Sequence, residues 1–200
     1  MTTPSTHSTQ ATQSGAKASA ADRLRISGVL CGEVPILANL AEDDCRYLQM
    51  VAETLEYQPG QIVIRQGEES RNLWIVLDGK CEVIREPDAA NNGERPVVLA
   101  QLEPYQHFGE MSFFNPAPHS VSVRAKTQLR LLRFSRAHYD RLVEEDRAAA
   151  YKIAFNAITG LAQRLRHLTD RVADLENINP SEAHSEWSTF RGKLFDGWNV

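Results

Sequence analysis

The sequence has few of the residues that mark an oxidising compartment or a membrane. Its 200 residues include three widely spaced cysteines, Cys31, Cys45 and Cys81, with no CxxC pair. This spacing predicts reduced thiols rather than a disulfide framework. The sequence also lacks an apolar run of about eighteen residues and an apolar segment near its N-terminus. We therefore expect a cytoplasmic protein without a membrane span or a secretory signal.

Excess positive charge and catalytic motifs are missing as well. The 22 Lys and Arg residues are outnumbered by 26 Asp and Glu residues, giving a net charge of −4, which argues against general affinity for nucleic acid. His107, Glu110 and His119 lack a closely paired His-x-His spacing for a metal, and no nucleophile lies beside a base. We expect neither a metal, a tightly bound cofactor nor enzymatic activity.

The composition changes along the chain and predicts four segments. Residues 1–28 are rich in Thr, Ser and Ala and are expected to form a disordered tail. A transit peptide is the alternative, which the late position of the basic residues in this segment disfavours. Residues 29–146 are expected to form a globular domain, 147–178 a long helix, and 179–200 a short aromatic helix or tail.

The globular segment starts with a helical pattern and continues as short strands. Acidic residues at 42–44 predict the first turn of a helix with Leu48, Val51 and Leu55 on one face, although Ala41 provides no side-chain cap. Turn dipeptides then separate apolar runs at 62–65, 73–77, 81–85, 97–102, 120–125 and 129–134. Many short strands at close spacing predict a sandwich or barrel. Ser135 is expected to cap a further helix.

One stretch, residues 108–125, has the features of an anion-binding loop. Gly109 leaves the backbone bare and Glu110 adds a carboxylate directly after a strand. Residues 111–115 suit a single helical turn, which is stopped by Pro116 and Pro118. Such a turn can hold a phosphate on its first N–H groups, while the carboxylate takes sugar hydroxyls.

This stretch resembles the phosphate-binding cassette of the cyclic nucleotide-binding domain family, which includes the bacterial cAMP receptor protein and modules of channels and kinases. Two further phrases, residues 57–67 and 73–79, stand where that family has them. The resemblance implies a mainly β jelly-roll barrel with flanking helices and a long C-terminal dimerisation helix. It also implies a ligand such as cAMP, cGMP or a cyclic dinucleotide. The implied ligand contacts are Gly109, Glu110, Met111, Ser112, His119 and Ser120.

The resemblance has two departures. His119 stands where the family has an arginine that takes the cyclic phosphate, and Tyr105-Gln106 replaces a common Gly-Asp. A neutral imidazole in place of a guanidinium loses a charge-assisted contact of about 1.5–3 kcal/mol. Arg124 is not expected to substitute, because strand alternation sends residues 119 and 124 to opposite faces.

The long helix carries apolar residues at intervals of three and four. This pattern predicts a coiled-coil seam between two parallel helices of a homodimer, with Arg164 and its charged neighbours on a solvated flank; packing within the chain is the alternative. The seam residues are Tyr151, Ala154, Ile158, Leu161, Leu165, Leu168, Val172 and Leu175. The resemblance also implies that this helix touches the base of the nucleotide, and Thr159 and Gln163 are polar positions that could do so; ordinary surface or seam-flanking positions are the alternative.

The last segment combines a helix start with an aromatic stripe. Residues 179–182, Asn-Pro-Ser-Glu, form a capping-box pattern. The stripe of Trp187, Phe190, Leu194 and Trp198 suits docking on the chain itself, on a dimer mate or on a protein partner. No recognition-helix pattern follows the long helix, so DNA binding is not expected.

Two functions fit these features. The first is signal transduction by a dimeric sensor that relays a cyclic nucleotide or dinucleotide signal to a protein partner. The second is an adaptor that keeps the fold, has lost cAMP binding, and acts through protein–protein contacts.

Overall fold

The computed structural model describes residues 25–26, 29–87 and 95–178, with side chains described for 31–87 and 95–171. The predicted tail over most of residues 1–28 and the aromatic stripe of Trp187, Phe190, Leu194 and Trp198 therefore lie outside the described residues.

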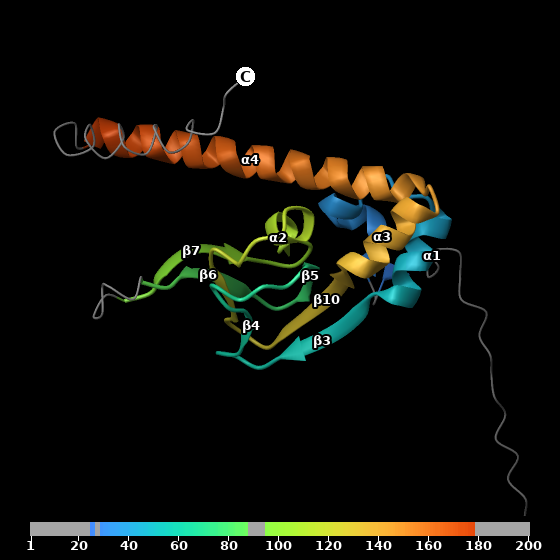
Figure 1. Cartoon of the computed structure of the whole chain (residues 1–200). Coiled ribbons are helices and arrows are strands. Elements are labelled where there is room, and N and C mark those ends of the chain that lie inside the picture. Colours follow the sequence, from blue (N-terminus) through green and yellow to red (C-terminus); the bar gives the residue numbers. More distant parts are fainter. Residues whose placement is uncertain (1–24, 27–28, 88–94, 179–200) are drawn as a thin grey trace, which may run out of the picture.

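The described residues form two four-stranded sheets with helices at one end and along one side (Figure 1). Among the described residues every strand pairing is antiparallel. The four-stranded sheets have the orders β3-β10-β5-β8 and β4-β9-β6-β7, and β1 and β2 pair in a separate two-stranded sheet. The strands are β1 (Arg25–Ile26), β2 (Val29–Leu30), β3 (Glu53–Tyr57), β4 (Ile62–Ile64), β5 (Asn72–Asp78), β6 (Cys81–Arg85), β7 (Val97–Leu102), β8 (His107–Phe108), β9 (Ser122–Ala125) and β10 (Leu129–Ser135). The helices are η2 (Cys31–Glu33), η3 (Pro35–Leu37), α1 (Glu42–Val51), α2 (Glu110–Phe114), α3 (Arg136–Glu144) and α4 (Ala148–Ile178).

All six predicted strand runs are present: two match the observed strands at both ends, and the other four differ by one or two residues. The first helix is shorter than predicted, because Leu55 lies in β3 and not on the helical face with Leu48. Its N-terminus at Ala41 has no side-chain cap, as expected, whereas Ser135 accepts a hydrogen bond from the backbone N–H of His138 and caps α3.

Two hydrophobic cores hold the fold together. One lies between the sheets and contains Trp74 and Phe108, whose rings stack 6.1 Å apart. The other joins β5 and β10 to the helices and contains Phe113 of α2 and Ile153 of α4, both fully buried. Since β5 contributes alternate residues to both cores, its side chains are buried on both faces, and this strand links the sheets to the helices.

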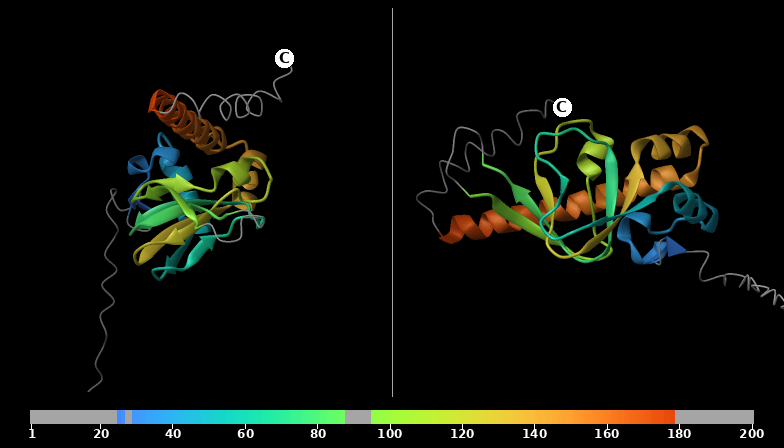
Figure 2. Two further views of the ribbon diagram at one scale, coloured as in Figure 1. Left: turned by 90° about the vertical axis from the view of Figure 1, so that its left-hand side faces the viewer. Right: turned by 90° about the horizontal axis from the view of Figure 1, so that it is seen from below.

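Helix α4 runs along one side of the sheets, and α2 lies between the sheets and α4 (Figure 1). Figure 2 shows the same arrangement from two further directions. The first three turns of α4 bury Ile153 and Ala157 against the domain, and Asn156 donates hydrogen bonds to the carbonyls of Ile36 and Ala38 at 3.1 and 3.0 Å. These contacts fix the helix over the end of β8, where the predicted cassette begins.

Candidate functional site

The cassette is held in place by Gly109 and Phe113. Gly109 has a φ of 84° and is the N-cap of α2; a Cβ there would lie 2.5 Å from the carbonyl oxygen of Asn72, so only glycine fits. Phe113 is fully buried with its ring 5.4 Å from that of Tyr139. Its carbonyl accepts a hydrogen bond from Arg136 at 3.0 Å, which satisfies the C-terminal end of α2.

Glu110 lies under the long helix and is only 2% exposed. Its Oε1 accepts a hydrogen bond from Nη1 of Arg164, whose Nη2 donates to the carbonyl oxygen of His107 at 2.7 Å. The other oxygen, Oε2, is buried and has no partner among the described residues. Burial raises the pKa of Glu110, and the positive charge of Arg164 opposes this rise.

His119 is also buried and is bound at both ring nitrogens. Its Nδ1 lies 3.1 Å from Oγ of Ser112, and its Nε2 lies 2.8 Å from Oγ of Ser70. Burial lowers the pKa of His119, while the carboxylate of Glu68 opposes the change. The ring therefore faces the cassette as a neutral hydrogen-bonding group near pH 7.

The remaining predicted contacts lie around these two buried residues. The side chain of Met111 is 63% exposed, and Ser120 is exposed with its carbonyl accepting a hydrogen bond from Nη1 of Arg85 at 2.8 Å. Arg124 pairs with Glu82 at 2.7 Å and does not enter the cassette. Residue 119 lies before β9, however, so strand alternation is not the reason for this separation.

A cavity of about 300 Å³ lies between β8 and α4, next to Arg164. Thr159 and Gln163, the predicted base contacts, line it together with His107 and Gly160. His107 is 6% exposed, and its Nε2 is buried without a partner among the described residues. Burial lowers the pKa of His107 to about 4, with a further contribution from Arg164, so its ring is neutral.

Sequence reasoning missed Arg164, Ser70 and His107 as parts of the site. Arg164 is expected on a solvated flank, and its side chain is indeed 46% exposed, but its guanidinium also binds Glu110. A signal for it exists in the sequence, since Arg164 continues the inward face of α4 after Ile153, Ala157 and Gly160 at steps of four, three and four. Ser70 has no such signal, because its contact with His119 spans 49 residues.

In the described ranges no cluster of His, Cys, Asp and Glu is arranged to hold a metal ion. None of the helices within those same ranges is both long and apolar enough to cross a bilayer.

The fold is that of a cyclic nucleotide-binding domain. A crystal structure of such a domain from Methylobacillus flagellatus superimposes with a TM-score of 0.63 at 20% identity, covering 72% of this chain and 83% of that one. The Thermus thermophilus catabolite activator protein superimposes with a TM-score of 0.60 at 27% identity, covering 71% and 63% of the two chains.

Sequence comparison gives the same result. The cAMP-dependent protein kinase regulatory subunit of Schizosaccharomyces pombe is 33% identical over 114 residues, which are 57% of this chain and 26% of that protein. The CRP-like cAMP-activated global transcriptional regulator of Mycobacterium tuberculosis is 29% identical over 122 residues, or 60% and 50%. The chain thus spans about a quarter of the first relative and half of the second. Residues 54–146 match the family model of the cyclic nucleotide-binding domain.

Proposed function

We propose that this chain binds a cyclic nucleotide at the cassette and relays its occupancy through α4 to a protein partner, acting as a dimer. One observation carries the proposal. Oε1 of Glu110 is held by Arg164, while the buried Oε2 has no partner in the part of the chain that the structure describes. An unsatisfied buried acceptor costs about 1–3 kcal/mol. A ribose hydroxyl donating to Oε2 would remove that cost, so the carboxylate is oriented and desolvated in advance for a sugar.

The same residues offer a place for the phosphate. The first N–H groups of α2, at Met111 and Ser112, have no carbonyl partner one turn earlier in the helix. Ser112 and His119 add a hydroxyl and an imidazole beside them. The cyclic phosphate would accept hydrogen bonds from these groups while the ribose binds Glu110. Thr159 and Gln163 are proposed to contact the base from the cavity beside α4.

Titration calorimetry on the full chain with cAMP, cGMP and cyclic di-GMP tests this proposal. We expect saturable binding of at least one of them. Glu110→Ala is expected to weaken binding about 10- to 100-fold, since it removes a hydrogen bond to a charged group. Glu53→Ala is the matched control, because Glu53 pairs with Arg133 at 2.6 Å on the opposite sheet edge, away from α2. Absence of binding by all three ligands would contradict the proposal.

The relay is proposed to act through Arg164. Its guanidinium bridges Glu110 to α4, so a ribose hydroxyl that shares the carboxylate alters the contact between cassette and helix. A ligand shifts a conformational equilibrium only if it binds the two states differently. Hydrogen exchange across residues 148–178 should therefore change on ligand addition in the wild type and change much less in Arg164→Ala. Equal changes in both proteins would contradict this relay.

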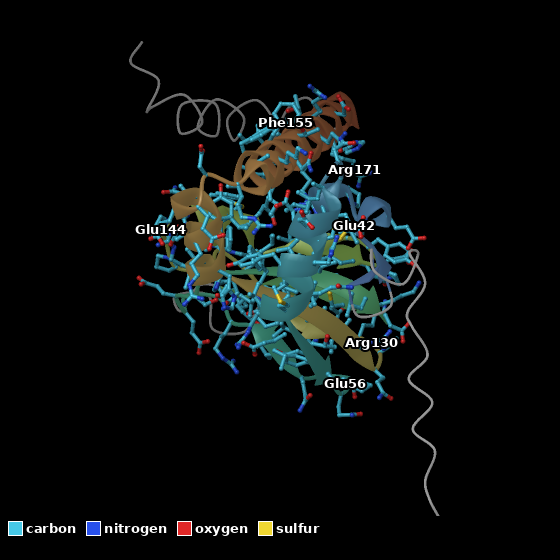
Figure 3. The ribbon with its side chains drawn as sticks, turned by 90° about the vertical axis from the view of Figure 1, so that its right-hand side faces the viewer. Glu42, Glu56, Arg130, Glu144, Phe155 and Arg171 are labelled. Carbon is cyan, nitrogen blue, oxygen red and sulfur yellow. The ribbon has the colours of Figure 1, made fainter. Side chains whose placement is uncertain are left out.

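We propose that the chain dimerises through the outer face of α4, because this face carries exposed apolar side chains. Tyr151, Phe155 and Ile158 are 64–66% exposed, and Leu165 and Leu168 are each 53% exposed. Figure 3 shows Phe155 on the side of α4 that is turned away from the sheets. A second copy of the helix would cover this stripe. The proposed interface residues are Ile158, Leu161, Leu165, Leu168, Val172 and Leu175.

An adaptor that does not bind cAMP is the second candidate. It is favoured by the contacts of His119, whose nitrogens are both bound to serine hydroxyls and which offers no permanent positive charge to a phosphate. A His119→Arg variant that gains cAMP affinity would show that the rest of the pocket is intact. In the adaptor, ligand addition would leave hydrogen exchange of the wild-type α4 unchanged, and the proposed partner would dock on Trp187, Phe190, Leu194 and Trp198.

A further inference from the structure

Three segments of the chain fix the His119 ring. The backbone N–H of His119 donates to the carbonyl of Glu68 at 2.9 Å, and the N–H of Gly67 donates to the carbonyl of His119 at 2.8 Å. The ring nitrogens then contact Ser112 on α2 and Ser70 on the segment before β5. Since both the backbone and the ring are held, the imidazole has one orientation toward the cassette.

The protonation state of this ring decides what Ser112 can offer to a ligand. In the neutral ring one nitrogen donates and the other accepts. If Nδ1 accepts, the Ser112 hydroxyl donates to it and is lost to the ligand. In the imidazolium both nitrogens donate, so the Ser112 hydroxyl accepts from Nδ1 and its own proton is free to donate to an anion. Protonation of His119 therefore supplies a positive charge and a hydroxyl donor at once.

We infer that Ser70 is a positioning residue that holds His119 so that the Ser112–His119 pair binds the phosphate of the ligand, and that this binding is coupled to proton uptake by His119. The inference rests on the proposed function, because the phosphate belongs to the nucleotide bound there. The step is a proton transfer: an O–H bond of a hydronium ion in the solvent breaks, an N–H bond forms on the ring, and water is left behind.

The charged side chains near the His119 ring are bound to other groups, so they do not supply the positive charge that protonation of the ring would give. Glu68 is paired with Arg65 at 3.5 Å, and Glu110 is turned to Arg164. Arg71 and Arg85 donate to the carbonyls of Phe113 and Ser120, at 3.4 and 2.8 Å. Burial holds the pKa of His119 below its usual value, so the ring is mostly neutral near pH 7 and becomes a cation as the pH falls. The expected direction is tighter binding at lower pH.

Calorimetric titration of the full chain with cAMP from about pH 5.5 to about pH 8 tests the inference. Affinity should rise by up to about tenfold per pH unit as the pH falls, the limit for uptake of one proton per ligand. His119→Gln, which cannot titrate, should bind weakly with no such slope. His119→Arg should bind more tightly and without a slope, because the guanidinium stays charged.

Ser70 has a separate expected effect. Ser70→Ala leaves an Nε2–H of the imidazolium without its acceptor, and hydrogen bonds to charged groups are stronger than those to neutral ones. The pH at which the affinity rises should therefore be lower in Ser70→Ala than in the wild type. Ser70→Thr keeps the hydroxyl and should restore the wild-type value. A merely structural role for Ser70 would change the affinity by the same factor at every pH. Thermal unfolding at neutral pH checks that each variant is folded.

The outcomes separate this inference from the proposed function. A wild type that binds cAMP with the same pH dependence as His119→Gln overturns the proton coupling and leaves nucleotide binding in place. A Ser70→Ala profile that is parallel to the wild type overturns the positioning role alone. Absence of cAMP binding by both the wild type and His119→Arg across the whole pH range overturns both the inference and cAMP as the ligand.

Discussion

At the residue scale, the buried polar side chains of the cassette differ in how far they are satisfied. Glu110 has one oxygen bound and one without a partner, His119 has both nitrogens bound, and Nε2 of His107 has none among the described residues. Burying such groups without partners is unfavourable. Arg164 binds both Glu110 and the backbone of His107, so the two unsatisfied atoms of these residues belong to the contact between α2, β8 and α4.

His107 should make the fold sensitive to acid. The folded state lowers its pKa from 6.5 to about 4, so the unfolded chain takes up a proton first and stability falls as the pH drops through this window. The loss from this residue is about 3 kcal/mol between neutral pH and pH 4. Urea unfolding of wild type and His107→Gln across this range measures it. The variant should show a shallower pH dependence of stability than the wild type. Identical slopes for His107→Gln and wild type would contradict the assignment.

Gly109 has a left-handed backbone conformation and a close neighbouring carbonyl group. Gly109→Ala would suffer both its φ of 84° and a Cβ 2.5 Å from the carbonyl of Asn72, with an expected cost of about 2–4 kcal/mol. Gly60→Ala is the matched control, because Gly60 has a φ of 88° and nothing within 4 Å of the added Cβ. It should cost about 1 kcal/mol. Chemical denaturation of both variants tests this, and equal costs would show that the cassette turn relaxes around the new methyl group.

At the scale of elements, α4 has two apolar faces with different partners. Ile153 and Ala157 are buried in the helical core of the domain, whereas Phe155 and Ile158 are about two-thirds exposed. Arg164 lies where the inward face leaves the core and reaches the cassette. A helix with both faces apolar is expected to be covered on both sides. One helix thus connects the core, the candidate site and the proposed dimer interface.

Substitution of two isoleucines on α4 distinguishes its role in the domain core from its role in the proposed dimer interface. Ile153→Ala removes a fully buried side chain and should lower the free energy of unfolding by about 2–4 kcal/mol at any protein concentration. Ile158→Ala, five residues later, should leave the stability of the monomer nearly unchanged and lower the unfolding midpoint of the dimer in a concentration-dependent way. Thermal melts over a range of protein concentrations distinguish the two effects. A concentration-independent loss of several kcal/mol in Ile158→Ala would place that residue in the domain core instead.

At the scale of the whole molecule, the barrel and the helices are joined by β5, which contributes to both cores. The candidate site lies on this junction, since α2 follows β8, the edge strand next to β5, and touches α4 through Glu110. A ligand at the cassette therefore contacts the barrel and the helix together. We expect the coupling between the barrel and α4 to depend on few residues, of which Arg164 is the one that binds both Glu110 and the backbone of His107.

The oligomeric state tests the outer face of α4 directly. Leu165→Glu should convert the proposed dimer to a folded monomer in light scattering coupled to size exclusion, because a charge at an apolar seam is unfavourable. Met50→Glu is the matched control: Met50 is 77% exposed on α1 and is not one of the proposed seam residues, so its replacement should leave the mass unchanged. A wild type that is monomeric at all concentrations would remove the dimer from the proposal.

The pattern of neighbouring residues was sufficient to predict several strands and the cassette segment. Alternating apolar residues and turn dipeptides located the strands, and the Gly109–Glu110 sequence located the cassette, because strand periodicity and backbone freedom are properties of neighbouring residues. Leu55 was misassigned because a single leucine fits a helical face as well as a strand. The family match over residues 54–146 agrees with the resemblance seen in the motifs.

Contacts between distant segments were decided only by the tertiary structure. Arg164 reaches Glu110 across 54 residues, and Ser70 reaches His119 across 49 residues, so neither pairing is visible in local spacing. Burial also depends on distant segments. Gly160 of α4 packs against the ring of His107, and burial of this ring lowers its pKa to about 4. The sequence alone located six of the ten strands of the described residues, the helices α1, α3 and α4, and the cassette segment. The packing of α4 on the barrel decided which polar groups are buried there, since desolvation depends on neighbours from the whole chain.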